Sequence, residues 1–242
     1  MDLYEHKVLT TSQLRDLYFD SQRVTERRLL KLYQHGVVQR FRPASEEGSY
    51  PFHFLLGDLG AQVVAAEMGV ELKDLKLAKD RLVRIAYSPR LSHLVALNTF
   101  FSRLIHRCRL TQDLRVTHWW GEDRVRRRWG QIVLPDALGQ LEGAGTRVRF
   151  FLELDQGTES PSKLAKKLSG YHEASMVPES PQLLLFCFPD NRREASARKA
   201  LVPCGMTIAT TTMGRHAEDP LGKIWLALGS NRRACLLGVR PR

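Results

Sequence analysis

The chain lacks the sequence features of membrane, secreted and zinc-binding proteins. Its 242 residues contain nothing near the roughly 20 consecutive apolar residues that cross a bilayer. The opening residues, M-D-L-Y-E-H-K, lack the basic-then-apolar order of a signal peptide. The four cysteines have neither a C-x-x-C pair nor histidines at zinc spacing: Cys108, Cys187, Cys204 and Cys235. We therefore expect a cytosolic protein without membrane contact, whose thiols are reduced and mostly buried.

Positive charge is the exceptional quantity in the composition. Lys and Arg number 37 against 26 Asp and Glu, which gives a net charge of +11. Such an excess attracts polyanions, whereas 43% hydrophobic and 26% charged residues are ordinary for a folded protein. The length suffices for one large domain or two smaller ones. We expect a folded protein whose partner is double-stranded DNA.

Residues 1–70 have the pattern of a helix-turn-helix followed by a hairpin. Thr11 or Ser12 can cap a first helix, and Ser21 precedes a second at roughly 22–34. Residues 37–42 and 50–56 read as strands around a polar loop at 44–49. This order predicts a winged helix domain.

The second of these helices is expected to bury Val24, Leu29, Leu30 and Leu32 or Tyr33. Its other face and the following wing carry groups that bind phosphates and base edges. The expected DNA contacts are Gln22, Arg23, Thr25, Arg27, Arg28, Lys31, Arg40 and Arg42. The alternatives are a winged module that contacts protein and a small helical domain with an ordinary solvated face.

The remaining chain reads as a linker at 71–91 and a second domain at 92–242. The domain opens with an amphipathic helix at 92–108. Strands are expected at 114–120, 132–134, 147–155, 182–188 and 206–212, with edge strands or a hairpin at 221–228 and 233–239. Helices are expected from Ser160-Pro161 and at 191–200. The strand, helix, strand order predicts a parallel crossover, hence an α/β domain with a central mixed sheet.

Acidic residues mark three segments of this second domain. Glu153 and Asp155 lie two apart on a predicted strand, so both project from one face. Asp136 follows an apolar run, and a mixed sheet can bring it and Glu122 to the same place. Carboxylates grouped in this way bind Mg²⁺ or Mn²⁺, and the expected ligands are Asp136, Glu153 and Asp155. The alternative is structural: the strand carboxylates pair with Arg147, Arg149 or other arginines, and Asp136 caps a turn.

Two lysines follow the predicted acidic strand. Lys163 and Lys167 lie one helical turn apart, and either could offset charge on a phosphate. The predicted catalytic set is Glu122, Asp136, Glu153, Asp155, Lys163 and Lys167.

These motifs resemble a known superfamily. The order W-x-E, P-D, E-x-D and K-x-x-x-Y is similar to the PD-(D/E)xK restriction-endonuclease-like superfamily. With T-T-S-Q-L, R-R-L-x-K-L, F-F-L-E-L-D-Q-G-T-E-S and K-L-S-G-Y, roughly residues 8–190 resemble the replication-relaxation proteins of bacterial plasmids and other mobile elements. The resemblance implies a winged helix joined to a nuclease-like domain, with a DNA-nicking or DNA-remodelling role. A homodimer and other replication or mobilisation proteins are among the expected partners.

One position departs from the superfamily pattern. Asp155 stands where the strand motif ends in lysine, and Lys163 or Lys167 can compensate. The leading interpretation is a metal-dependent DNA endonuclease, and the alternative is an inactive, nuclease-like regulator or replication-initiation factor. A tyrosine nucleophile with a histidine-rich metal site is disfavoured, because the sequence has no H-x-H pair.

Overall fold

The chain folds into two compact units, Met1–Ser102 and Arg103–Arg242. The computed structural model describes residues 1–43, 50–77, 80–111, 113–143, 145–157 and 161–239. The expected wing loop at 44–49 and the expected cap Ser160 lie outside the described residues. The division falls inside helix α6 (Leu91–Thr111), beyond the segment 71–91 expected as the linker.

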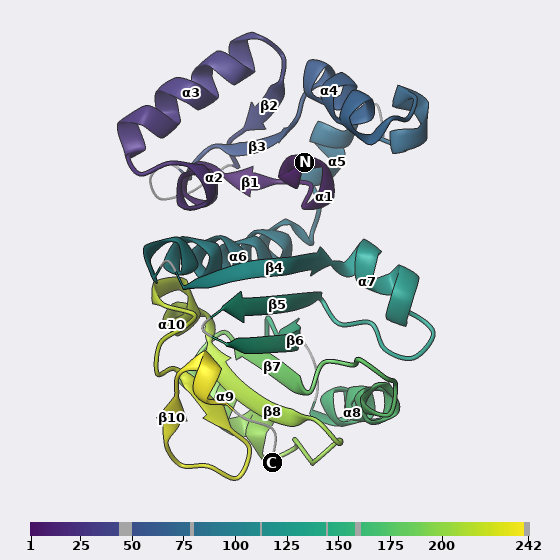
Figure 1. Cartoon of the computed structure of the whole chain (residues 1–242), viewed down its shortest axis with the longest axis vertical. Helices are drawn as coiled ribbons and strands as arrows, with labels where there is room; N and C mark the ends of the chain where they lie inside the picture. The colour runs from purple at the N-terminus through teal and green to yellow at the C-terminus, as the bar shows by residue number, and fades with distance from the viewer. Residues whose placement is uncertain (44–49, 78–79, 112, 144, 158–160, 240–242) are drawn as a thin grey trace. The chain divides into compact units, whose positions relative to one another are not determined.

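The first unit combines helices with a small antiparallel sheet (Figure 1). Its three strands lie in the order β1-β3-β2. The elements in chain order are α1 (Asp2–Glu5), β1 (Leu9–Thr10), α2 (Thr11–Tyr18), α3 (Gln22–Gln34), β2 (Val38–Phe41), β3 (His53–Leu56), α4 (Asp58–Met68), η1 (Leu72–Leu75) and α5 (Arg81–Ala86).

Caps set the starts of the two helices expected from the sequence. Thr10 and Gln13 form a capping box at α2. The Ser21 hydroxyl accepts the Val24 N–H at 3.2 Å and caps α3. Gly36, just after α3, has φ +69°, a conformation that favours glycine. The cap of α2 is thus Thr10, not Thr11 or Ser12 as predicted, whereas α3 begins at Gln22 as predicted.

The expected buried stripe of α3 is largely wrong. Leu29 is buried, but four other apolar residues of the helix are 38–42% exposed: Val24, Leu30, Leu32 and Tyr33. Thr25 is fully buried instead. Its hydroxyl donates to the Ser21 carbonyl at 2.8 Å, which satisfies the buried polar group.

The second unit is built on a seven-stranded mixed sheet in the order β10-β9-β8-β7-β6-β5-β4. Strands β6, β7 and β8 are parallel, and the other neighbours are antiparallel. The elements are β4 (Leu114–Gly121), α7 (Glu122–Trp129), β5 (Ala137–Gly143), β6 (Thr146–Leu154), α8 (Pro161–Ser175), β7 (Leu183–Phe188), α9 (Asn191–Arg198), β8 (Thr207–Thr212), α10 (Met213–Glu218), β9 (Trp225–Ala227), β10 (Arg233–Ala234) and η2 (Leu236–Gly238). The predicted α/β class, mixed sheet and parallel crossover are confirmed.

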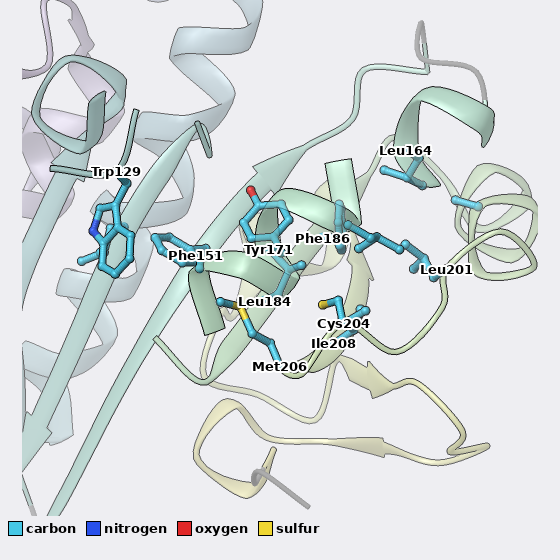
Figure 2. Close-up of a cluster of buried hydrophobic side chains, with 14 of the residues drawn as sticks. Trp129, Phe151, Leu164, Tyr171, Leu184, Phe186, Leu201, Cys204, Met206 and Ile208 are labelled. Atoms are coloured by element: carbon cyan, nitrogen blue, oxygen red, sulfur yellow. The ribbon is translucent and has the colours of Figure 1, made fainter. Parts of the chain in front are cut away.

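Helices α7 and α8 join the sheet in one hydrophobic core (Figure 2). Trp129 of α7 meets Phe151 of β6 with ring centroids 5.4 Å apart, and Phe151 meets Tyr171 of α8 at 5.6 Å. Leu164 and Leu168 complete the buried face of α8. The buried face of α8 therefore consists of residues three or four apart, as expected of an amphipathic helix.

Ile132–Leu134 is not a strand, contrary to prediction. The N–H groups of Ile132 and Val133 both donate to the Trp129 carbonyl, so the chain continues the turn that ends α7. The strand begins after Pro135-Asp136 instead, at Ala137.

All four cysteines are free thiols, and three are buried: Cys108, Cys187 and Cys204. Burial raises the pKa of Cys187 well above its usual value. Among the described residues, no helix combines the length and apolar character needed to cross a bilayer.

Candidate active site

Strand register brings three of the predicted carboxylate positions to one end of the sheet. Gly121 of β4 pairs with Ala137 of β5, and Ala137 pairs with Leu152 of β6. The next positions beyond these pairs are Glu122, Asp136 and Glu153. The Leu154 N–H donates to Oδ2 of Asp136 at 2.8 Å, which fixes this carboxylate beside β6.

Glu153 is the most enclosed carboxylate of the group, at 3% exposure. Lys167 donates from Nζ to Oε2 at 2.9 Å, and the Tyr171 hydroxyl donates to Oε1. Burial and the nearby charge of Asp136 raise the pKa of Glu153 to about 7, against the lowering effects of Lys167 and Tyr171. Glu153 therefore can change protonation state near neutral pH.

Helix α8 presents Lys167 and Tyr171 to Glu153 because they are four residues apart and lie on one face. Tyr171 is fully buried against Phe151, and its contact with Glu153 contributes to a pKa far above the usual value. Gly170 permits close packing, since a Cβ there would lie 2.9 Å from the Ile132 carbonyl oxygen. The helix is thus packed closely against the Ile132-Val133 turn that follows α7.

Of the two predicted cations, the structure brings Lys167 to Glu153. Lys163 lies one turn earlier on α8 and is exposed. Glu122 accepts Arg126 at 2.6 Å within α7, an ordinary i,i+4 pair.

Asp155 is bound by an arginine and a backbone N–H group. Arg193 of α9 donates to its Oδ2 from Nε at 2.9 Å and also from a terminal nitrogen. The Gly157 N–H donates to Oδ1. Both oxygens are engaged, as are both oxygens of Glu153, so the role of Asp155 as a third metal ligand stays a prediction. No local spacing pattern predicts Arg193 as the partner, because it lies 38 residues away in the chain.

The structural alternative holds for Asp155, whose arginine partner is Arg193, whereas the two β6 arginines named for it pair elsewhere. Arg147 pairs with Glu142 at 3.0 Å. Arg149 donates to Gln140 Oε1 at 2.6 Å and to the Glu179 carbonyl at 2.8 Å.

Asp136 and Glu153 remain as the carboxylate pair suited to a divalent ion. Within the described part of the chain, no group of three or more His, Cys, Asp or Glu side chains is arranged to hold a metal. Two carboxylates nevertheless suffice for Mg²⁺, which usually keeps several water ligands. The effect of Asp136 on the pKa of Glu153 marks a repulsion that a cation would relieve.

The predicted DNA-contact residues of α3 are exposed with one exception. Gln22, Arg23, Arg27, Arg28 and Lys31 reach solvent. Thr25 does not, because it is fully buried, and its prediction as a DNA contact is wrong.

The two arginines predicted on the wing stack on aromatic rings. The Arg40 guanidinium lies 4.3 Å from the Tyr33 ring centre and 4.2 Å from that of Phe52. Arg42 lies 4.0 Å from the Phe52 ring centre. These contacts hold both cations in defined positions.

Comparison with known proteins identifies a family and a distantly similar solved structure. A structure titled as that of restriction endonuclease FokI matches at 13% identity with a TM-score of 0.35, covering 87% of this chain and 40% of that chain. No curated protein matches the sequence. The family model described as replication-relaxation matches residues 1–179, and the chain therefore belongs to the replication-relaxation family.

Proposed function

We propose that the protein binds double-stranded DNA of a plasmid or other mobile element in the cytosol and nicks it with the help of Mg²⁺ or Mn²⁺. The membership of the replication-relaxation family supports the biological setting. The net charge of +11 supports a polyanionic partner.

We assign DNA binding to the first unit, interpreted as a winged helix. The order α2, α3, β2, β3, with the three-stranded sheet, supports this interpretation. In it, α3 is the recognition helix and β2 and β3 form the wing. Arg27, Arg28 and Lys31 would contact phosphates or base edges, and Arg40 and Arg42 would contact the backbone.

We assign cleavage to the second unit, interpreted as a nuclease-like domain. One observation carries this assignment: the Lys167 ammonium lies 2.9 Å from Glu153 Oε2, and Asp136 stands next to Glu153 across strands β5 and β6. Lys167 thus places a cation beside the carboxylate pair, although Asp155 stands where the superfamily motif has lysine.

Each residue of this site has a defined part in the proposed reaction. Asp136 and Glu153 would hold the metal ion, which polarises the scissile phosphate and lowers the pKa of the attacking water. The Lys167 ammonium offsets negative charge that develops on the phosphate. Tyr171 holds Oε1 of Glu153 and so fixes the direction of that carboxylate.

A second candidate is a DNA-binding regulator or replication-initiation factor in which the nuclease-like unit is only a scaffold. It is favoured by the pairing of Asp155 with Arg193 at the position where the superfamily motif has lysine. This candidate predicts sequence-specific binding without metal-stimulated cleavage.

The test is conversion of supercoiled plasmid to open circle with Mg²⁺ or Mn²⁺. Asp136→Ala and Glu153→Ala should each abolish conversion while DNA binding persists. Glu173→Ala removes an exposed carboxylate from the same helix α8 and should nick like the wild type. Unchanged nicking in both site variants would refute the assigned site, and no nicking by the wild type under any metal condition would favour the regulator.

A further inference from the structure

The edge strand β4 and its neighbours carry a basic and aromatic surface that the proposed site does not use. It comprises six residues from β4, α7 and β6, which we call the β4 patch: Arg115, His118, Trp120, Arg124, Arg147 and Arg149. In the sheet order, β4 is the terminal strand, so no strand in the described part of the chain pairs with its outer edge.

Ring contacts and electrostatic interactions show that these residues lie close together. The His118 and Trp120 ring centres are 5.1 Å apart, and the Arg124 guanidinium lies 4.8 Å from the Trp120 ring centre. The pKa of His118 is lowered by burial first, and then by the positive charges of Arg149, Arg124 and Arg147. Arginines from α7 and β6 thus act on one imidazole of β4.

The contacts within the patch leave an excess of positive charge. Glu142 accepts both Arg115 at 3.3 Å and Arg147 at 3.0 Å, so one carboxylate serves two guanidinium groups. Those arginine side chains remain 77% and 70% exposed.

Hydrogen bonding and stacking hold Arg149 and Arg124 in place. Arg149 donates to Gln140 Oε1 and to the Glu179 carbonyl, both neutral acceptors, so these bonds leave its positive charge in place. The Arg124 guanidinium stacks on the Trp120 ring, which fixes its position.

We propose that the β4 patch binds the phosphate backbone of double-stranded DNA, as a second contact surface in addition to α3. This inference rests on the proposed DNA-binding function and deepens it. Planar guanidinium groups suit phosphate oxygens, and their placement by aromatic and amide neighbours lowers the entropy lost on binding. Trp120 and Arg124 flank Glu122 in the chain, so the patch is continuous with the strand end that carries the carboxylates.

The test is the salt dependence of binding to a duplex of random sequence, followed by fluorescence anisotropy. The variant Arg115→Ala/Arg124→Ala/Arg147→Ala should weaken binding about tenfold or more and reduce the slope of log affinity against log salt by about 2 to 3, since each lost phosphate contact removes about 0.9. Arg115→Lys/Arg124→Lys/Arg147→Lys should keep most of the slope.

A control of equal charge change is Lys199→Ala/Lys223→Ala/Arg232→Ala. Lys223 and Arg232 precede β9 and β10, at the other end of the sheet order from β4. This control should bind with the wild-type slope. Melting temperatures of the variants within a few degrees of the wild type would establish that the changes in affinity do not reflect unfolding.

The outcomes separate this inference from the proposed function. If the alanine patch variant keeps the wild-type slope while Arg27→Ala/Arg28→Ala loses affinity, the β4 patch inference fails and DNA binding by α3 stands. If the wild type binds no duplex, both fail. Tighter binding of an RNA duplex than of the DNA duplex through the patch would overturn the choice of DNA.

Discussion

At the residue scale, Glu153 sets the chemistry of the candidate site. A carboxyl with 3% exposure is costly to ionise unless a cation or hydrogen bonds support it. Lys167 and Tyr171 provide that support, and Asp136 opposes it. The side chains around Glu153 therefore determine both its charge and its affinity for a divalent ion.

The first residue-scale prediction separates the two lysines of α8. Lys167→Ala should lower the nicking rate about 10²- to 10³-fold, because it removes the cation next to Glu153. Lys163→Ala, one turn away on the same helix, should change the rate less than about threefold. Initial rates on supercoiled plasmid at saturating DNA measure both, and equal losses in the two variants would contradict the assignment of Lys167.

The second residue-scale prediction concerns the pH dependence of nicking. Tyr171 donates to Glu153 and lowers the pKa of that carboxyl, so Tyr171→Phe should raise it. Because the ionised carboxylate binds the metal, the acidic limb of the rate profile should move to higher pH, by about one unit for one hydrogen bond. Activity should recover at pH 9.

The control for this pH prediction is Tyr87→Phe, at a tyrosine that is 85% exposed. Its rate profile should match that of the wild type. A Tyr171→Phe profile that falls at every pH by the same factor would instead indicate a loss of packing without a change in the pKa of Glu153.

At the element scale, a buried ion pair ties α9 to the terminal hairpin. Glu194 of α9 is 3% exposed, and it accepts Arg233 of β10 through both oxygens, at 2.6 and 3.1 Å. The Thr210 hydroxyl of β8 also donates to Glu194, at 2.6 Å. Arg215 of α10 also lies 3.7 Å from Oε2 of Glu194, so four elements share one buried carboxylate.

The element-scale prediction is a loss of stability when Arg233, the nearer of the two arginines paired with Glu194, is removed. Arg233→Met should lower the free energy of unfolding by about 3 kcal/mol, because it leaves Glu194 charged and poorly paired. Glu194→Gln/Arg233→Met should lose less than Arg233→Met. Urea unfolding measures both, with Arg232→Met, at the exposed neighbouring position, as the control. A double variant less stable than Arg233→Met would contradict this account.

Elements with strong local patterns could be predicted from the sequence. Leu183–Phe188 is an apolar run bounded by polar residues, and α3 has a Ser21 cap and a glycine near its end, so both were expected within about one residue. Ile132–Leu134 has the same apolar character as a short strand. Hydrogen bonds to Trp129 make it a turn, and nothing in its composition reveals that.

The carboxylate pair of the site was predictable, but its partners were predictable only in part. The position of Asp136 at a strand end and the alternation of the strand that carries Glu153 predict that these carboxylates lie together. The sequence left two candidate lysines, Lys163 and Lys167, one helical turn apart. The pairing of Asp155 with Arg193 depends on the β7-α9-β8 crossover, which brings a helix residue to the end of β6. Contacts that depend on tertiary packing cannot be predicted from the spacing of residues in the sequence.

At the whole-molecule scale, the proposed activity divides between the two units. The first unit holds the exposed basic residues of α3, and the second holds the carboxylate pair and the β4 patch. Substitutions in α3 should therefore change how much DNA is needed, whereas substitutions at the carboxylates should change the reaction itself.

The last prediction applies this division to the kinetics of the full chain. Arg27→Ala/Arg28→Ala should raise the DNA concentration for half-maximal nicking about 10- to 100-fold, since each lost contact costs about 1 kcal/mol or more, while the rate at saturation stays near the wild-type value. Lys73→Ala/Lys76→Ala removes equal charge from exposed positions after α4 and should leave both parameters unchanged. A lower saturating rate with an unaltered half-maximal concentration would place the α3 arginines in the cleavage step and contradict the division. Glu153→Ala should show no nicking at any DNA concentration, because binding cannot replace the missing carboxylate.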